Sequence, residues 1–277
     1  MRNRILAGLG VAALATVGVA APATALSSTT ADIWVVHAVP GVTVDVYIEG
    51  ALAIEDFVPG AVQALPNQPA PASYTVDIVA ANSAAPAQGA GLITAEAAVV
   101  PNTSYTLVAH PEEGGALTIS PFVNDLTPVG AGQASVTVRH TADAAAVDVV
   151  ALPSTSLFSG VTNGQEGVTA VAAGTYDLQV QVDGPAPQAV AIDLPDTVLA
   201  AGTHYFIHAF GPGGGPYSAI IFTIGDTPAG VPAGSAGLVA ENDGAATGLL
   251  VGGAALLALL AAAGVIIARR QAVTAER

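Results

Sequence analysis

Two stretches decide the fold because the second repeats the first: VVHAVPGVTVDVYIEG at Val35–Gly50 and VRHTADAAAVDVVAL at Val138–Leu152. Each stretch begins with a strand-like run that ends in a histidine, His37 in the first and His140 in the second. A Val-Asp-Val core follows each histidine at the same spacing. The repeat period is near 100 residues, which is too long for a solenoid unit and suits two complete domains in tandem.

Alternation around the repeat predicts β-strands. Val44, Val46 and Ile48 face one way and Asp45 and Tyr47 face the other, which is typical of a strand with one buried face. The proline-containing segment 58–73 and the polar segment 152–167 are predicted to be loops. Similar strand patterns occur at 33–37, 74–79, 92–100, 104–109 and 116–123, and again at 136–140, 147–151, 175–182, 189–194, 204–210 and 217–224.

No amphipathic helix separates these strands, so the pattern predicts an all-β chain with two tandem antiparallel β-sandwich (Ig-like) domains. We place the first domain at 31–126 and the second at 134–226. The Pro- and Gly-containing segment 127–133 reads as the linker between them. Because the chain has no cysteine, each domain depends on its own core.

The two ends of the chain predict export and anchoring. Residues 1–25 have a basic start, an apolar run and a small-residue Ala-Thr-Ala site, which predicts a signal peptide. Residues 227–246 form a stalk. Residues 247–268 carry no charge and are long enough for a transmembrane helix, and the basic tail 269–277 predicts a cytoplasmic C-terminus. We therefore expect a single-pass protein of the cell membrane with extracellular domains, and processing of the end by a sortase-like enzyme stays open.

The charge of the chain excludes one class of partner. Its formal net charge is −15, and Arg139 is the only basic residue between Leu26 and Gly244. Such a surface repels phosphates, so no nucleic acid partner is expected. It would attract cations, although a solubilising acidic coat is the simpler interpretation.

Two histidine–aspartate pairs are the obvious candidates for chemistry: His37 with Asp45, and His140 with Asp148. Alternation points both histidines toward the core at a strand end beside a turn, where an imidazole commonly bonds a turn carbonyl. We prefer that structural role to metal binding or proton transfer. The aspartates are predicted to face solvent and to discourage edge-to-edge pairing of strands.

One difference between the repeats concerns the outward face of the first strand. Trp34 and Val36 stand where the second repeat has Thr137 and Arg139. Either the only tryptophan is covered by another part of the chain, or Trp34 and Val36 form a contact patch for a partner.

Metal and catalytic signals are weak. Turn carboxylates such as Glu112, Glu113, Asp125, Asp143 and Asp226 could bind calcium, but no EF-hand loop is present. The sequence has no nucleophile elbow, no HExxH motif and no phosphate-binding loop. No catalytic residue and no cofactor are therefore assigned, and the chain is not expected to be an enzyme.

The repeated pattern resembles the domain-of-unknown-function family 4397. The elements that carry the resemblance are VVHAVPGVTVDVYIEG, SYTVDIVA and SYTLVAH in the first copy, and VRHTADAAAVDVVAL, GTYDLQVQV and HYFIHAF in the second. The resemblance implies exported bacterial surface domains, present here in two tandem copies, with no assigned reaction. In the second copy Val150 stands where the first has the aromatic Tyr47.

We expect a non-catalytic cell-surface protein that presents two acidic sandwiches in a structural, adhesive or ligand-binding role. Its partner would be a protein or a glycan bound through loops or through the Trp34 face. The alternative is a calcium-dependent binding module, which predicts carboxylates clustered at the hinge between the domains.

Overall fold

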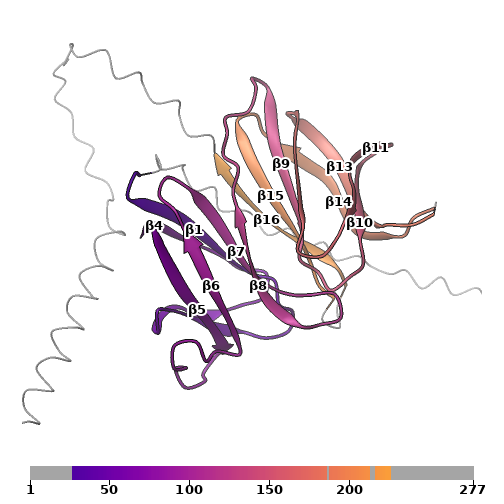
Figure 1. The fold of residues 1–277 in the computed structure, drawn as a ribbon. Coiled ribbons are helices and arrows are strands. Elements are labelled where there is room, and N and C mark those ends of the chain that lie inside the picture. The colour runs from indigo at the N-terminus through magenta and orange to yellow at the C-terminus, as the bar shows by residue number, and fades with distance from the viewer. Residues whose placement is uncertain (1–26, 186, 213–215, 226–277) are drawn as a thin grey trace, which may run out of the picture. The chain divides into compact units, whose positions relative to one another are not determined.

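The computed structural model describes residues 27–185, 187–212 and 216–225, and this part of the chain contains strands, turns and loops (Figure 1). All sixteen strands belong to one compact unit, Met1–Gly230. The predicted signal peptide, stalk, transmembrane helix and cytoplasmic tail lie outside the described residues. Among the residues that are described, no helix is long and apolar enough to cross a membrane.

The first half of the chain forms two four-stranded sheets, ordered β4-β1-β7-β8 and β3-β2-β5-β6. In each sheet the strand order differs from the chain order, so the chain crosses between the two layers. The strands are β1 (Thr30–His37), β2 (Val44–Ile48), β3 (Ala51–Phe57), β4 (Val62–Pro69), β5 (Ala72–Ala80), β6 (Ile93–Val99), β7 (Ser104–Pro111) and β8 (Leu117–Val123).

The second half repeats this arrangement, with sheets ordered β12-β9-β15-β16 and β11-β10-β13-β14. The four sheets therefore form two similar sandwich-like units. The strands are β9 (Gln133–His140), β10 (Val147–Ala151), β11 (Thr155–Val161), β12 (Glu166–Ala172), β13 (Gly174–Val182), β14 (Val190–Leu199), β15 (Thr203–Phe210) and β16 (Ser218–Gly225).

The prediction of purely antiparallel sheets needs a correction. In the first half β1 pairs with β7 in parallel, and in the second half β9 pairs with β15 in parallel. Parallel neighbours require a long crossover, and here the strands of the other sheet supply it in each half. The remaining strand pairs are antiparallel.

The predicted loops at 58–73 and 152–167 were also wrong, because they hold strands. β4 lies within the first segment, and β11 and the start of β12 lie within the second. β3, which precedes the first segment, was not predicted either. All four are edge strands that bury little of either face, so their sequences lack apolar alternation. β4 even contains Pro66 and ends at Pro69, which an edge strand tolerates.

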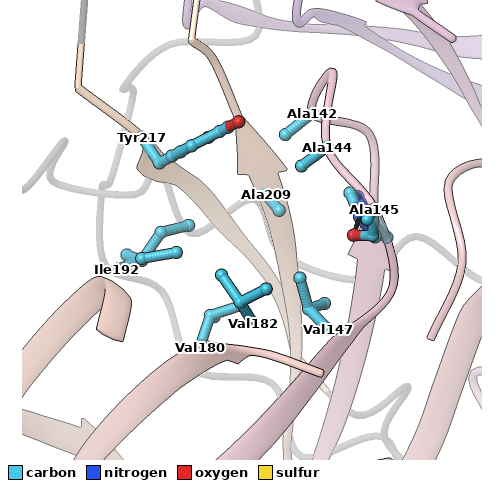
Figure 2. A pocket seen from close by; sticks show the side chains of 11 residues that line it. Ala142, Ala144, Ala145, Val147, Val180, Val182, Ile192, Ala209 and Tyr217 are labelled. Carbon is cyan, nitrogen blue, oxygen red and sulfur yellow. Dashed lines mark hydrogen bonds between the residues drawn. The ribbon is translucent and has the colours of Figure 1, made fainter. Parts of the chain in front are cut away.

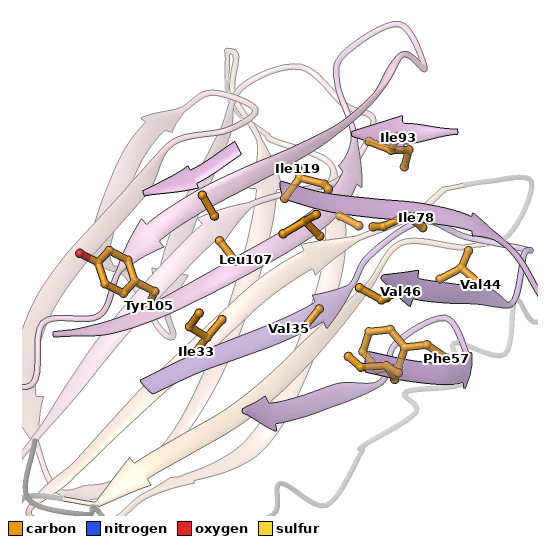
Figure 3. Packing of buried hydrophobic residues seen from close by; sticks show 14 of the residues in the cluster. Ile33, Val35, Val44, Val46, Phe57, Ile78, Ile93, Tyr105, Leu107 and Ile119 are labelled. Carbon is orange, nitrogen blue, oxygen red and sulfur yellow. The ribbon is translucent and has the colours of Figure 1, made fainter. Parts of the chain in front are cut away.

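Each half has its own apolar core between its two sheets. In the first half, Ile33, Val35 and Leu107 of one sheet pack against Val46 and Ile78 of the other (Figure 3). The second half buries the corresponding residues Val136, Val138, Val149, Val180 and Ile207. Alternate residues along β1 and β9 therefore point into the core of their own half.

Candidate functional site

The two motif histidines tie a turn to the strand that precedes it. Nε2 of His37 is 2.8 Å from the carbonyl oxygen of Val42, and Nε2 of His140 is 2.8 Å from that of Ala145. Because a carbonyl oxygen only accepts, each Nε2 carries the proton and donates. Both imidazoles are buried, and burial lowers the pKa of each histidine more than its bond to the backbone raises it. Both rings are therefore neutral at neutral pH.

The two motif aspartates hold a bulge in the neighbouring strand. Oδ1 of Asp45 accepts a hydrogen bond from the backbone N–H of Asp56 at 2.9 Å, and Oδ1 of Asp148 accepts from Gly160 at 2.8 Å. Asp56 and Gly160 both have positive φ angles, 49° and 65°, at an irregular register of the strand pair. The carboxylates thus satisfy amides that the irregular ladder leaves without a strand partner.

This geometry corrects the role predicted for Asp45 and Asp148. β2 and β10 are interior strands, so these residues do not protect a sheet edge. Asp45 is buried rather than solvent-facing, while Asp148 is partly exposed and also accepts from Gln188 at 2.7 Å. The same acid at the same repeat position serves the same hairpin in both halves.

Trp34 and Val36 are not an exposed patch. Their side chains, 8% and 0% exposed, belong to an apolar cluster that joins the two halves of the chain. The ring of Trp34 stacks on Phe222 with 5.0 Å between centroids. The second half is therefore the partner of this face, and the interpretation that Trp34 is covered fits the structure. The cluster consists of Trp34, Val36, Ala38, Val108 and Phe122 from the first half and Phe206, Ile220, Phe222 and Ile224 from the second.

Arg139 lies fully buried in the same inter-half interface. Its Nε donates to Glu166 Oε2 at 2.8 Å, and its Nη2 donates to Asn124 Oδ1 at 2.9 Å. The guanidinium also lies over the rings of Phe122 and Phe206, 4.6 and 5.0 Å from their centroids. Arg139 stands out in the sequence as a single arginine in a lysine-free segment. That Asn124 of the other half accepts its hydrogen bond could not be predicted from the sequence.

Two further histidines, His110 and His208, are buried, and His208 is the strand partner of Arg139. His110 contacts the carbonyl oxygen of Pro111 at 2.9 Å and the hydroxyl of Ser120 at 2.8 Å. His208 is fully buried, with its ring 5.8 Å from that of Phe222. Burial, with the charges of Arg139 and His110 adding to it, holds the pKa of His208 well below its ordinary value. The ring stays neutral at neutral pH, which avoids a second positive charge in the interface.

The described surface carries no positively charged side chain. Arg139 is the only lysine or arginine in the described ranges, and it is 0% exposed. All five histidines are at most 1% exposed. Four acidic residues lie outside the described ranges, namely Asp226, Glu241, Asp243 and Glu276, so these ranges hold 17 of the 21 acidic side chains.

The structure brings two of the predicted calcium loops together without forming a carboxylate cage. Oδ1 of Asp143 accepts from the backbone N–H of Gly114, so the turn that holds Glu112 and Glu113 contacts the turn after His140. Asp125 bonds instead to the backbone of Thr127. Within the residues that the structure describes, no group of three or more His, Cys, Asp or Glu side chains is placed to hold a metal ion. Asp226 lies outside that part.

The comparison with protein families identifies one domain. The family described as "Domain of unknown function (DUF4397)" matches residues 31–150. The matched range covers nearly all of the first sandwich and extends through the second histidine–aspartate motif into β10. A second copy is not matched separately, and the similarity of the two halves rests on the structure.

The other comparisons are distant. No curated protein sequence matches the chain significantly. Among solved structures, the Bacillus anthracis TIE protein is 9% identical with a TM-score of 0.18, and the match covers 72% of this chain and 34% of that one. A suggested cell adhesion protein from Bacteroides eggerthii is 11% identical with a TM-score of 0.20, covering 73% of this chain and 99% of that one. At these scores neither structure supports an argument about this chain.

Proposed function

We propose that this chain is an exported, non-catalytic surface protein, anchored by its predicted C-terminal span. Its two sandwiches act as one anionic unit in adhesion. The partner would be a protein or glycan that presents positive charge. Neither calcium nor an enzymatic cofactor is required.

The observation that carries the proposal is the charge of the described surface. Seventeen acidic side chains lie in the described residues, and no side chain there that can carry a positive charge is exposed. A surface of one sign raises the rate of encounter with a partner of the opposite sign and suppresses contact with anionic partners. A coat that only solubilises the protein would have the same composition but would not raise attachment to a cationic surface.

The environment of the motif residues supports a role without catalysis. His37 and His140 donate to turn carbonyls, and Asp45 and Asp148 accept bulge amides. A general acid or base must be free to reach a substrate proton. These four side chains are engaged in holding the two repeated hairpins instead.

Attachment of cells that display the full chain would test the proposal. Displaying and non-displaying cells are compared on surfaces coated with polylysine, polyglutamate or neutral dextran, and protease treatment of intact cells checks that the domains are outside. We expect display to raise attachment to polylysine alone. The gain should disappear at about 1 M salt, where the Debye length falls to about 3 Å.

Two matched variants localise the contact. Glu112→Gln/Glu113→Gln neutralises one exposed turn, and Glu55→Gln/Asp56→Asn neutralises the exposed edge strand β3. If one patch dominates, one of the pairs should lose most of the attachment. Display that changes nothing on polylysine, or that raises attachment equally on dextran, would refute the proposal.

A further inference from the structure

The interface between the halves contains a buried base with no hydrogen-bond partner. His208 of β15 is 0% exposed, and within the part of the chain that the structure describes neither of its ring nitrogens has a partner. Its ring stacks on that of Phe222, with 5.8 Å between centroids and 17° between the planes. Such a site accepts a neutral imidazole far better than a charged one, because burial penalises the charged form and no acceptor offsets the penalty.

The strand neighbour of His208 would oppose a charge on it. Arg139 of β9 is its register partner and already carries a positive charge in the same interface. The acid that neutralises Arg139 is Glu166 of β12, and β12 lies on the side of β9 away from β15. His208 is therefore separated by a strand from the one carboxylate that the structure pairs with a cation here.

The other elements of the interface offer no better partner. His110 of β7, in the first half, also opposes a positive charge on His208. On β15 itself the nearest titratable residue on the same face is His204, and Asp125, after β8, interacts with His204. β8 and β16 contain no charged or titratable side chain, and Asp32 of β1 pairs with Ser104 at the opposite end of β7 from His110.

Each sandwich has what it needs to stay folded without the other. The first core draws only on the first half (Figure 3), and the second core only on the second. The apolar pocket beside the second core is likewise lined by second-half residues alone, among them Val147, Val180 and Ile192 (Figure 2). Separating the halves would therefore expose the interface cluster and leave both cores closed.

The polar ties between the halves are few and can be replaced by water. They are the hydrogen bonds from Arg139 to Asn124 at 2.9 Å, from Gly114 to Asp143 at 2.8 Å and from Asn163 to the carbonyl oxygen of Pro111 at 3.0 Å. Between β8 and β9 the chain is continuous only through residues 124–132, which contain no strand. This segment is placed to act as a hinge.

We propose that the interface is an acid-operated hinge: when His208 takes up a proton, the two sandwiches separate about residues 124–132 while each stays folded. Separation lets water bond to the imidazolium and screen its repulsion from Arg139. Burial holds the pKa of His208 well below its ordinary value in the closed form, and hydration restores it in the open form. The open form thus binds more protons, and each pH unit below about 6.5 multiplies the ratio of open to closed protein by about ten for this one group.

Trp34 reports the opening without a label, because it is the only tryptophan of the chain and stacks on Phe222 in the interface. The full-length protein is taken from about pH 8 to about pH 5 and back, the range in which histidine titrates. Trp34 emission wavelength and quenching by acrylamide are recorded, while circular dichroism follows the strands and methyl NMR follows Val46 and Val149 in the two cores. We expect a reversible red shift and a several-fold rise in quenching, with the strand signal and both cores unchanged.

His208→Val gives the second half the residue that the first half has at this register, Val108. This variant should keep Trp34 shielded at a pH where the wild type is open. The matched control His37→Gln removes a buried histidine of the first core, and its amide can still donate to Val42, so it should open as the wild type does. The proposal is overturned if Trp34 stays shielded throughout, if it becomes accessible only as the strand signal is lost, or if His208→Val opens as the wild type does.

Discussion

The two halves of this chain share a backbone plan and differ in what they place on it. Both use a histidine to hold a turn, an aspartate to hold a bulge and a tyrosine to hold the corner before the seventh strand. Tyr105 accepts from the N–H of Val100 at 3.1 Å, and Tyr205 accepts from that of Ala200 at 2.8 Å. Such a tyrosine corner is a known feature of Ig-like sandwiches. The repeated residues therefore specify the fold and leave the faces free to differ.

The two halves differ in the side chains on the outward faces of β1 and β9, and these faces meet in the inter-half interface. At one position of the first strand the first half has Val36, paired with Val108, and the second half has Arg139, paired with His208. The apolar set in one half and the polar set in the other are both buried in the inter-half interface. Identical faces would have brought two buried arginines together, so the difference lets two copies of one domain pack as one unit.

The interface provides the largest expected effect. Trp34→Ala should lower the free energy of unfolding by about 3–5 kcal/mol, because it removes a buried indole that stacks on Phe222. Denaturant unfolding of the full-length protein measures this change. The matched control Val198→Ala removes methyl groups from a residue that is 64% exposed and should be close to neutral. A loss below about 1 kcal/mol for Trp34→Ala would show that the contact between the halves is weak.

Acidification is the next test, and it probes the buried histidines of the two turns and of the interface. Burial lowers the pKa of His37, His110, His140 and His208, so the unfolded chain binds protons more readily than the folded one. Stability should therefore fall as the pH drops below about 6.5, by up to about 1.4 kcal/mol per pH unit for each histidine.

The matched variant His208→Val carries the residue that the first half has at that register. It should reduce the pH slope by about one proton, whatever its uniform cost from the lost side chain. Denaturation midpoints between pH 5 and 8 measure the slope, and an unchanged slope would mean that His208 is not the buried neutral base described above.

The bulge aspartates should show a smaller effect that separates the halves. Asp45→Ala leaves the Asp56 amide without its acceptor and should cost about 1–3 kcal/mol. Asp148→Ala should cost less, because Asp148 is partly exposed and water can replace it. Equal costs would contradict the difference in burial between the two motifs.

The tyrosine corners give the smallest effect. Tyr105→Phe removes only a hydroxyl and should cost about 1 kcal/mol, with Tyr205→Phe at or below that value because its bond is more exposed. Thermal unfolding of both variants measures the pair. A much larger loss in either would mean that the corner carries more of the fold than one hydrogen bond.

The sequence predicted the interior strands and the repeat, because Val44, Val46 and Ile48 alternate and the histidine motif returns. It also predicted the edge strands β6, β8, β14 and β16, but it failed for β3, β4, β11 and β12, which bury little of either face and show no apolar alternation. Trp34 illustrates the other limit: alternation places it on the outward face, but no local pattern says that Phe222 covers that face.

Scanning calorimetry of the full-length protein tests the central claim, that two sandwiches behave as one unit through the Trp34–Phe222 interface. We predict one transition for the sandwiches, with equal calorimetric and van't Hoff enthalpies, and a split into two transitions in Trp34→Ala. Two independent transitions in the wild type, unchanged by Trp34→Ala, would contradict it.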